Sequence, residues 1–248
     1  MMEDAFEGIA ADYDRMFPRD ICADRALLRS LFEKRGVERV LDCACGTGIH
    51  LPLLLEDGFH VTGSDLSPAM LRVARSRLEK AGVEVELHES SWRDLPDKVP
   101  GRYDAVICLG NSLPLEIGEE AVRRSLEGMR AMLREGGILV LAIRNADLQL
   151  KEKPRLVAIE PEPDLFLLNI CEYGPESVTQ RFFLIDSRKV PPSMSYYVFE
   201  LYDLTASRLK EIALKAGVER FTLYGDESLT EFSPYESQRL IFVGEQTP

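Results

Sequence analysis

The sequence has only three histidines, no clustered cysteine and no long apolar run among its 248 residues. Its five cysteines stand singly or inside apolar segments, without the C-x-x-C or histidine spacing of a zinc site. We therefore expect no metal centre and a reducing compartment. No stretch approaches the roughly 18 apolar residues of a membrane span, and the acidic N-terminus lacks a signal-peptide core. These absences predict a cytoplasmic protein.

Positive charge is also scarce. The 30 Lys and Arg residues are outnumbered by 42 Asp and Glu, which gives a net charge of −12, and no basic block interrupts the chain. Because a phosphate backbone or an anionic membrane repels such a surface, we expect neither nucleic acid nor membrane as a partner. The length suits one α/β domain with a full core and a small insertion.

The stretch 38–65 predicts a βαβ unit with a tight glycine turn. A strand at 40–45 leads into Gly46 and Gly48, where a backbone without Cβ atoms can pass close to a ligand. The helix that follows presents free N–H groups to the same ligand. The second strand ends at Asp65, whose carboxylate can accept both hydroxyls of a ribose. The unit therefore predicts a nucleoside site.

The glycine spacing separates two classes of nucleoside. A dinucleotide site needs a third glycine at the position of Leu51, so NAD is disfavoured. Residues 42–48 read D-C-A-C-G-T-G and residues 65–70 read D-L-S-P-A-M, and together they resemble the S-adenosylmethionine (SAM) site of class I methyltransferases. The resemblance implies a Rossmann-like sheet of seven mostly parallel strands flanked by helices. It also implies cofactor contacts from Asp42, Ala44, Gly46, Gly48, Asp65, Leu66 and Met70.

Two further segments match cofactor-binding parts of that family. The leader 3–34 predicts two short helices, and its Tyr13 resembles the tyrosine that closes over SAM, although packing alone explains an aromatic residue at this spacing equally well. Arg25 stands where related enzymes place a cation for the methionine carboxylate, with other basic residues of the leader, Arg29 and Lys34, as alternatives. By the same resemblance, the adenine is flanked by Ser91 and by Trp92, and Leu109 completes the cofactor set.

The carboxyl ends of the fourth and fifth strands are where an α/β sheet places its reacting groups. The N-P-P-Y tetrad of amide methylation is absent. Instead, residues 109–112 read L-G-N-S, as in glycine N-methyltransferase and the glycine/sarcosine methyltransferases. Residues 144–147 read R-N-A-D where that group reads R-N-Y-D, and there the arginine fork holds the carboxylate of the acceptor. Alanine at position 146 leaves the acceptor's identity open.

Bland alternatives exist for both acceptor residues. Asn111 could simply cap the following turn, and Arg144 could form a surface ion pair with Asp147. If the resemblance holds, Asn111 and Arg144 orient a small acceptor and Tyr13 helps to exclude water; these three are the candidate catalytic residues. No dedicated base is visible, because all three histidines look structural, with His50 facing out of its helix.

The rest of the chain predicts an insertion and the end of the core. Alternating polarity predicts antiparallel strands at 155–159, 165–172, 177–186 and 196–201, which would cover the acceptor site. We divide the chain into 1–147, the N-terminal helices and SAM core; 148–202, the β insertion; and 203–248, a helix and hairpin that complete the core. The other core elements are expected as strands at 83–88, 101–109, 138–143, 218–223 and 238–244 and helices at 49–57, 67–80, 119–133 and 204–216.

The leading hypothesis is therefore a SAM-dependent methyltransferase of a small molecule, with glycine or sarcosine as the type of amine acceptor. A second hypothesis keeps the cofactor and replaces the amine by a hydroxyl or carbon acceptor. A third is a regulatory protein that binds SAM without turnover, although such proteins lose the glycine turn or the ribose acid, and this sequence retains both. The oligomeric state is not predicted.

Overall fold

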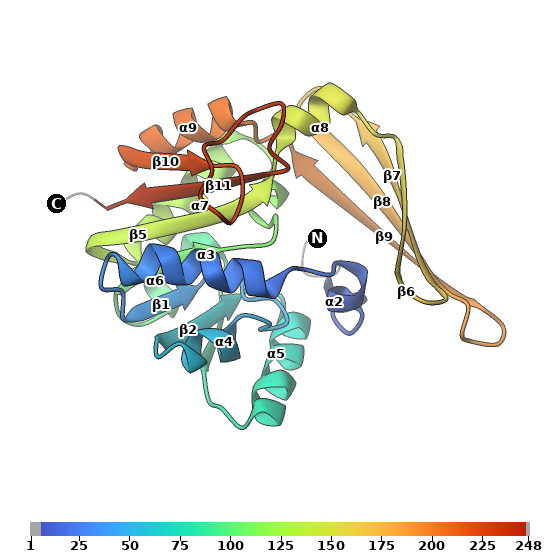
Figure 1. The fold of residues 1–248 in the computed structure, drawn as a ribbon, viewed down its shortest axis with the longest axis horizontal. Helices are drawn as coiled ribbons and strands as arrows, with labels where there is room; N and C mark the ends of the chain where they lie inside the picture. The colour runs from blue at the N-terminus through green and yellow to red at the C-terminus, as the bar shows by residue number, and fades with distance from the viewer. Residues whose placement is uncertain (1–5, 247–248) are drawn as a thin grey trace.

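The computed structural model describes residues 6–246, which form a seven-stranded sheet and a separate four-stranded sheet (Figure 1). The order of the large sheet is β10-β11-β5-β4-β1-β2-β3. Strands β1 to β5 run parallel, and β11 is antiparallel to both β5 and β10. The predicted fold, a mostly parallel Rossmann-like sheet with an antiparallel insertion, is confirmed. The strands of this sheet are β1 Arg39–Asp42, β2 His60–Asp65, β3 Glu86–Glu89, β4 Tyr103–Cys108, β5 Leu133–Arg144, β10 Arg220–Tyr224 and β11 Arg239–Glu245.

Helices cover both faces of this sheet because the central strands are apolar on both sides. Every residue of β4 is buried; Ala105 packs with one helical layer and Val106 with the other. The first layer consists of α3 Ile21–Glu33, α4 Leu51–Glu56 and α5 Pro68–Ala81. The second consists of η1 Trp92–Asp94, α6 Leu95–Lys98, α7 Glu119–Ala131 and α9 Ala206–Lys215.

The insertion forms a twisted antiparallel sheet that extends away from the core (Figure 1). It contains β6 Leu156–Glu162, β7 Leu165–Tyr173, β8 Ser177–Asp186 and β9 Ser193–Tyr202, close to the four predicted strands. A helix, α8 Ala146–Glu152, precedes it and was missed because the alternating pattern was extended back to 148. Asn145 caps this helix by accepting the N–H groups of Asp147 and Leu148.

The leader packs between the two sheets. Its short helix α2 Tyr13–Met16 contributes the fully buried Met16 to an apolar cluster with Met70 of α5 and with Phe182 and Phe199 of the insertion. The Tyr197 hydroxyl also donates to the Gly8 carbonyl at 3.0 Å. The two predicted leader helices are present, although residues 3–5 of that prediction lie outside the described residues. Within 6–246, no helix combines the length and the apolar character that crossing a membrane requires.

Candidate functional site

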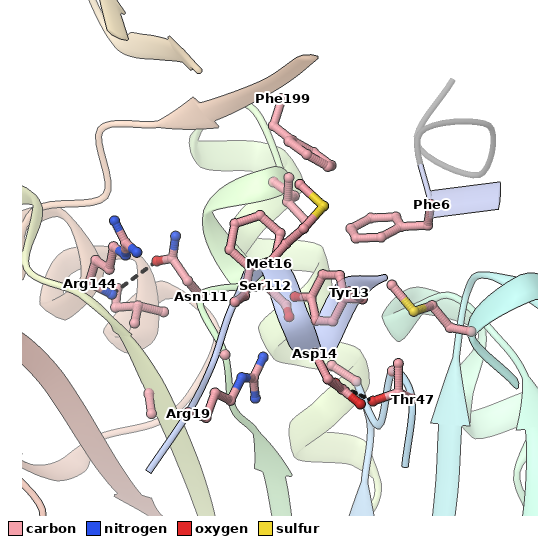
Figure 2. A pocket seen from close by; sticks show the side chains of 18 of the residues that line it. Phe6, Tyr13, Asp14, Met16, Arg19, Thr47, Asn111, Ser112, Arg144 and Phe199 are labelled. Carbon is pink, nitrogen blue, oxygen red and sulfur yellow. Dashed lines mark hydrogen bonds between the residues drawn. The ribbon is translucent and has the colours of Figure 1, made fainter. Parts of the chain in front are cut away.

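A cavity of about 700 Å³ opens where the carboxyl ends of β2, β1, β4 and β5 meet the insertion. The floor comes from the loops that leave these strands, one wall from the leader and the roof from the inner face of β6 to β9 (Figure 2). Because a parallel sheet directs its loops to this edge, residues far apart in the sequence line one space. Of the predicted site residues, the cavity is lined by Tyr13, Ala44, Gly46, Asp65, Leu66, Met70, Ser91, Trp92, Asn111 and Arg144.

Asp65 is held in place by the backbone around it. Its Oδ2 accepts the Gly46 N–H at 2.8 Å and its Oδ1 accepts the Ser67 N–H at 2.9 Å. Burial raises the pKa of this carboxyl, and these backbone donors act in the opposite direction. A carboxylate fixed between the glycine turn and the start of α5 has its free lone pairs directed at the cavity. This geometry suits the two hydroxyls of a ribose.

Glycine is required at the two positions of the turn for different physical reasons. Both have positive φ, +53° at Gly46 and +72° at Gly48. A Cβ on Gly46 would meet no protein atom within 4 Å, so that position leaves open space for a ligand. A Cβ on Gly48 would stand 3.0 Å from the Ala74 Cβ in α5. Gly48 does not line the cavity, which corrects its prediction as a cofactor contact: it allows the turn to pack against α5.

Asp42 lies beneath the turn and not in the cavity wall. It is only 1% exposed, and its Oδ1 accepts the Ala44 N–H at 3.3 Å. Burial raises the pKa of Asp42 to about 6, opposed by the charges of His50 and Arg19. Leu109 is likewise buried, outside the lining. Both were predicted as cofactor contacts, and the structure places both behind the wall.

The far end of the cavity, beyond β2, is built by the segment after β3. Ser91 caps η1 by accepting the Asp94 N–H, and the Trp92 indole N–H donates to the Cys43 carbonyl at 2.7 Å. The second bond fixes the ring against the glycine turn. Leu66 and Met70 add apolar surface to the lining beside Trp92. The residues predicted to flank the adenine therefore lie together.

The leader is tied to the glycine turn through Asp14. Its Oδ1 accepts the Thr47 hydroxyl at 2.7 Å, as Figure 2 shows, and its other oxygen pairs with Arg77 of α5. The neighbouring Tyr13 ring packs 5.1 Å from Phe17, centroid to centroid. Burial raises the Tyr13 pKa, and the nearby Arg19 guanidinium lowers it. Tyr13 is thus a neutral phenol at the cavity wall.

Arg25 does not line the cavity, and this corrects the prediction that it holds the methionine carboxylate. Its guanidinium pairs instead with Asp57, at 2.7 Å, and with Glu56 after the turn. Arg19, which was not predicted, lines the cavity. It lies between α2 and α3, and its guanidinium covers Gly110, where an added Cβ would overlap it. Among the described residues, no acid forms an ion pair with Arg19.

Asn111 and Arg144 lie side by side at the ends of β4 and β5 (Figure 2). The Asn111 Oδ1 accepts the Arg144 backbone N–H at 2.9 Å, and the Asn111 N–H donates to the Ala142 carbonyl at 3.1 Å. Asn111 has φ +67°, a conformation that few side chains adopt. No carboxylate of the described chain pairs with the Arg144 guanidinium. The predicted alternative, an ion pair with Asp147, is absent there, since that carboxylate accepts the Ala206 N–H.

The histidines do not line the cavity, in agreement with their structural interpretation. His50 is nevertheless buried, which corrects the expectation that it faces outward. Its Nε2 lies 3.1 Å from an oxygen of Asp24, whose second oxygen accepts from Arg239 at 2.9 Å. Arg239 also pairs with Glu227. Of the three arginines in the lining, Arg239 is therefore neutralised, while Arg19 and Arg144 are available to ligands.

Sequence reasoning missed several lining residues. Arg19 carried a usable signal, because it follows a proline and precedes Asp20, the capping residue of α3, and so had to lie in a loop. Asn169 and Gln180 showed only as polar residues on the inner face of two predicted strands. Glu227 falls in the stretch 226–236, to which the sequence analysis assigned nothing.

These features define a nucleoside-binding α/β protein of the class I methyltransferase type. The model of a methyltransferase domain matches residues 40–137. A glycine/sarcosine N-methyltransferase of Parasynechococcus marenigrum is 32% identical over 196 residues, 79% of this chain and 68% of that protein. A glycine/sarcosine/dimethylglycine N-methyltransferase of Actinopolyspora halophila is 33% identical over 198 residues, 77% of this chain but only 33% of its own length. Human glycine N-methyltransferase is 40% identical over 136 residues, 50% of this chain and 46% of its own length.

The chain belongs to the family of SAM-dependent methyltransferases that includes the glycine/sarcosine N-methyltransferases. Solved structures agree on the fold. A SAM-dependent methyltransferase from Clostridium acetobutylicum has a TM-score of 0.84 and 16% identity, covering 98% of this chain and 99% of that one. The sugar N-methyltransferase KedS8 of a Streptoalloteichus species has a TM-score of 0.73 and 21% identity, covering 95% and 92%. The predicted family and its cofactor, SAM, are confirmed.

Proposed function

We propose that the protein transfers the methyl group of SAM to the amine of a small acceptor that carries a carboxylate, of the type of glycine or sarcosine. The observation that carries this proposal is the unpaired Arg144 guanidinium at the acceptor end of the cavity. No acid of the described chain neutralises this cation, and a carboxylate is the ligand that a planar guanidinium binds through two hydrogen bonds. The names of the relatives point to the same class of acceptor.

The order of the strands supports one arrangement of SAM and the acceptor in the cavity. Along the sheet edge, the segment predicted to flank the adenine follows β3, Asp65 ends β2, the glycine turn follows β1, Arg19 covers the loop after β4, and Arg144 ends β5. With its ribose on Asp65, SAM would extend past the turn to Arg19, which meets the methionine carboxylate. Its methyl group would then face Asn111 and Arg144.

Positioning supplies the chemistry. The sulfonium already activates the methyl group, so the protein has to align the amine lone pair with the methyl carbon and exclude water. The Asn111 Oδ1 is engaged by the backbone, which leaves its amide NH₂ to donate to the acceptor carboxylate beside Arg144. The leader and the roof of the insertion enclose the acceptor. A neutral amine needs no strong base, in keeping with a lining without histidine.

Arg144→Met tests the proposal. Losing charge-assisted hydrogen bonds worth about 1.5–3 kcal/mol should raise the acceptor KM about 10- to 150-fold and leave the SAM Kd within about twofold. Release of S-adenosylhomocysteine with glycine, sarcosine and related amines measures the KM, and calorimetry measures the Kd. Arg220→Met, at an exposed arginine of β10, is the matched control.

Three outcomes would count against this function. An unchanged KM in Arg144→Met would remove the carboxylate argument. Turnover with hydroxyl or carbon acceptors alone would favour a methyltransferase of another kind of acceptor. Ala146, which replaces the tyrosine of the glycine methyltransferases, is the feature that keeps this alternative open. SAM binding without turnover of any small acceptor would favour a regulatory protein.

A further inference from the structure

The inner face of the insertion sheet is apolar over the part that covers the leader. Alternate residues of β7, β8 and β9 face the leader, and most of them are aliphatic or aromatic. Near the core, this face instead presents two amides, Asn169 from β7 and Gln180 from β8. Both line the cavity and both are nearly buried, with 7% and 5% of their surfaces exposed. Amides in an apolar roof are costly unless they have partners.

The protein leaves part of the hydrogen-bonding capacity of both amides unused. The Asn169 Oδ1 has no hydrogen-bond partner, and among the buried side-chain atoms of residues 6–246 in that state it alone belongs to the cavity lining. The other end of the Asn169 amide bonds the Cys171 thiol, which lowers the pKa of that thiol against the larger effect of burial. Gln180 makes no side-chain hydrogen bond within the described chain. Each amide therefore keeps capacity for a hydrogen bond that no residue of the described chain uses.

The amides lie at the acceptor end of the cavity. Gln180 pairs with Cys171 in the strand register, so the two amides flank one cysteine. The charge of Arg144 also reaches the Cys171 thiol, where it lowers the pKa. Asn169 and Gln180 thus flank a thiol that lies within reach of the Arg144 charge. Asp65 ends β2, three strands from β5 and Arg144 in the sheet order, so this polar cluster lies nearer to the acceptor end than to the ribose acid.

We propose that Asn169 and Gln180 form a second acceptor subsite, which binds a hydroxyl or amide group of the substrate. An unpartnered carbonyl oxygen needs a donor, which a hydroxyl or an amide supplies and a second carboxylate does not. This inference rests on the proposed function and narrows it. The acceptor is an amine with a carboxylate for Arg144 and a further hydrogen-bonding group, and is therefore larger than glycine or sarcosine.

Matched pairs of amino acids test the subsite. Threonine and valine are nearly equal in size, as are asparagine and leucine, and only the first member of each pair carries the polar group. In wild-type protein saturated with S-adenosylhomocysteine, calorimetry should show the polar member binding at least about tenfold more tightly. With SAM, kcat/KM should show the same preference.

Side-chain replacements then assign that preference. Gln180→Met and Asn169→Leu keep the volume and remove the hydrogen bonds, and should each reduce the preference severalfold while leaving the SAM Kd within twofold. Thr179→Val is the matched control, because Thr179 neighbours Gln180 on the outer face of β8 and should not change the preference.

The outcomes separate this inference from the proposed function. Equal binding of the two members of each pair, or a preference that survives both replacements, overturns the subsite even if glycine is methylated in an Arg144-dependent way. A preference that depends on Asn169 and Gln180 in the binding assay, without methyl transfer, supports the subsite and overturns the proposed reaction.

Discussion

Arg19 is predicted to hold the carboxylate of the cofactor, and Arg19→Met removes its charge while keeping most of its apolar stem. The guanidinium is half-buried, hydrogen-bonds the Tyr13 hydroxyl and forms no ion pair with an acid within residues 6–246. Charge-assisted hydrogen bonds of this kind contribute about 1.5–3 kcal/mol. The Kd for S-adenosylhomocysteine should therefore rise about 10- to 150-fold.

Two ligands show which part of the cofactor loses its contact in Arg19→Met. 5′-Methylthioadenosine keeps the adenosine and the sulfur but lacks the amino-acid end, so its affinity should stay within about twofold in Arg19→Met. Calorimetry gives both Kd values. The Kd for S-adenosylhomocysteine divided by the Kd for 5′-methylthioadenosine should rise by the full 10- to 150-fold. Arg25→Met is the control, because its ion pairs with Asp57 and Glu56 lie outside the cavity.

Two results would refute this reasoning. An equal loss of affinity for both ligands would mean that Arg19 supports the wall through Tyr13 and does not contact the carboxylate. A selective loss in Arg25→Met would restore the assignment made from the sequence.

Three further changes test the ribose acid and the support of the glycine turn. Asp65→Ala removes the carboxylate between the turn and α5 and should weaken SAM binding at least about tenfold by calorimetry; unchanged affinity would contradict the ribose assignment. Because the pKa of Asp42 is raised from 3.8 to about 6, the ionised form disfavours the folded state, and the penalty is absent below the lower value and complete above the higher. Asp42→Asn should therefore raise the free energy of unfolding of the ligand-free protein. In urea titrations the increase should grow from near zero at about pH 4 to about 3 kcal/mol above about pH 7. An increase that does not change with pH would disprove the pKa shift. Gly48→Ala should lower the free energy of unfolding by about 1–3 kcal/mol, because of the left-handed φ and the contact with Ala74. Gly58 also has a positive φ but has open space around it, so Gly58→Ala should lose only the conformational part. Equal losses in the two variants would exclude the contact with Ala74.

The fold was predictable because its signals are local and agree with one another. Apolar runs, the glycine turn and the Ser67 cap of α5 each specify a neighbouring element, and the strands of the insertion follow from alternation. Helix α8 was missed because the alternating pattern was extended back over it, and its cap, Asn145, also donates to the Pro234 and Ser237 carbonyls. That arrangement depends on chain about 90 residues away.

The site was less predictable where it depends on how elements pack against one another, because that packing decides which side chains face the cavity. Arg25 and Arg19 both precede β1 at plausible spacing, and only the packing of α3 decides which one faces the cavity. Gly46 and Gly48 look equivalent in the sequence, yet one leaves space for a ligand and the other for α5. Asn169 and Gln180 needed the register of two strands to be brought together.

Trp92 has a practical consequence. It is the one tryptophan of the chain, its indole N–H is fixed by the Cys43 carbonyl, and its ring borders the part of the cavity assigned to the adenine. A base stacked against this ring would change the emission of the indole without any label. The unmodified molecule thus contains a fluorescent reporter of cofactor occupancy, which can follow the arrival and departure of SAM in real time while the acceptor is still unknown.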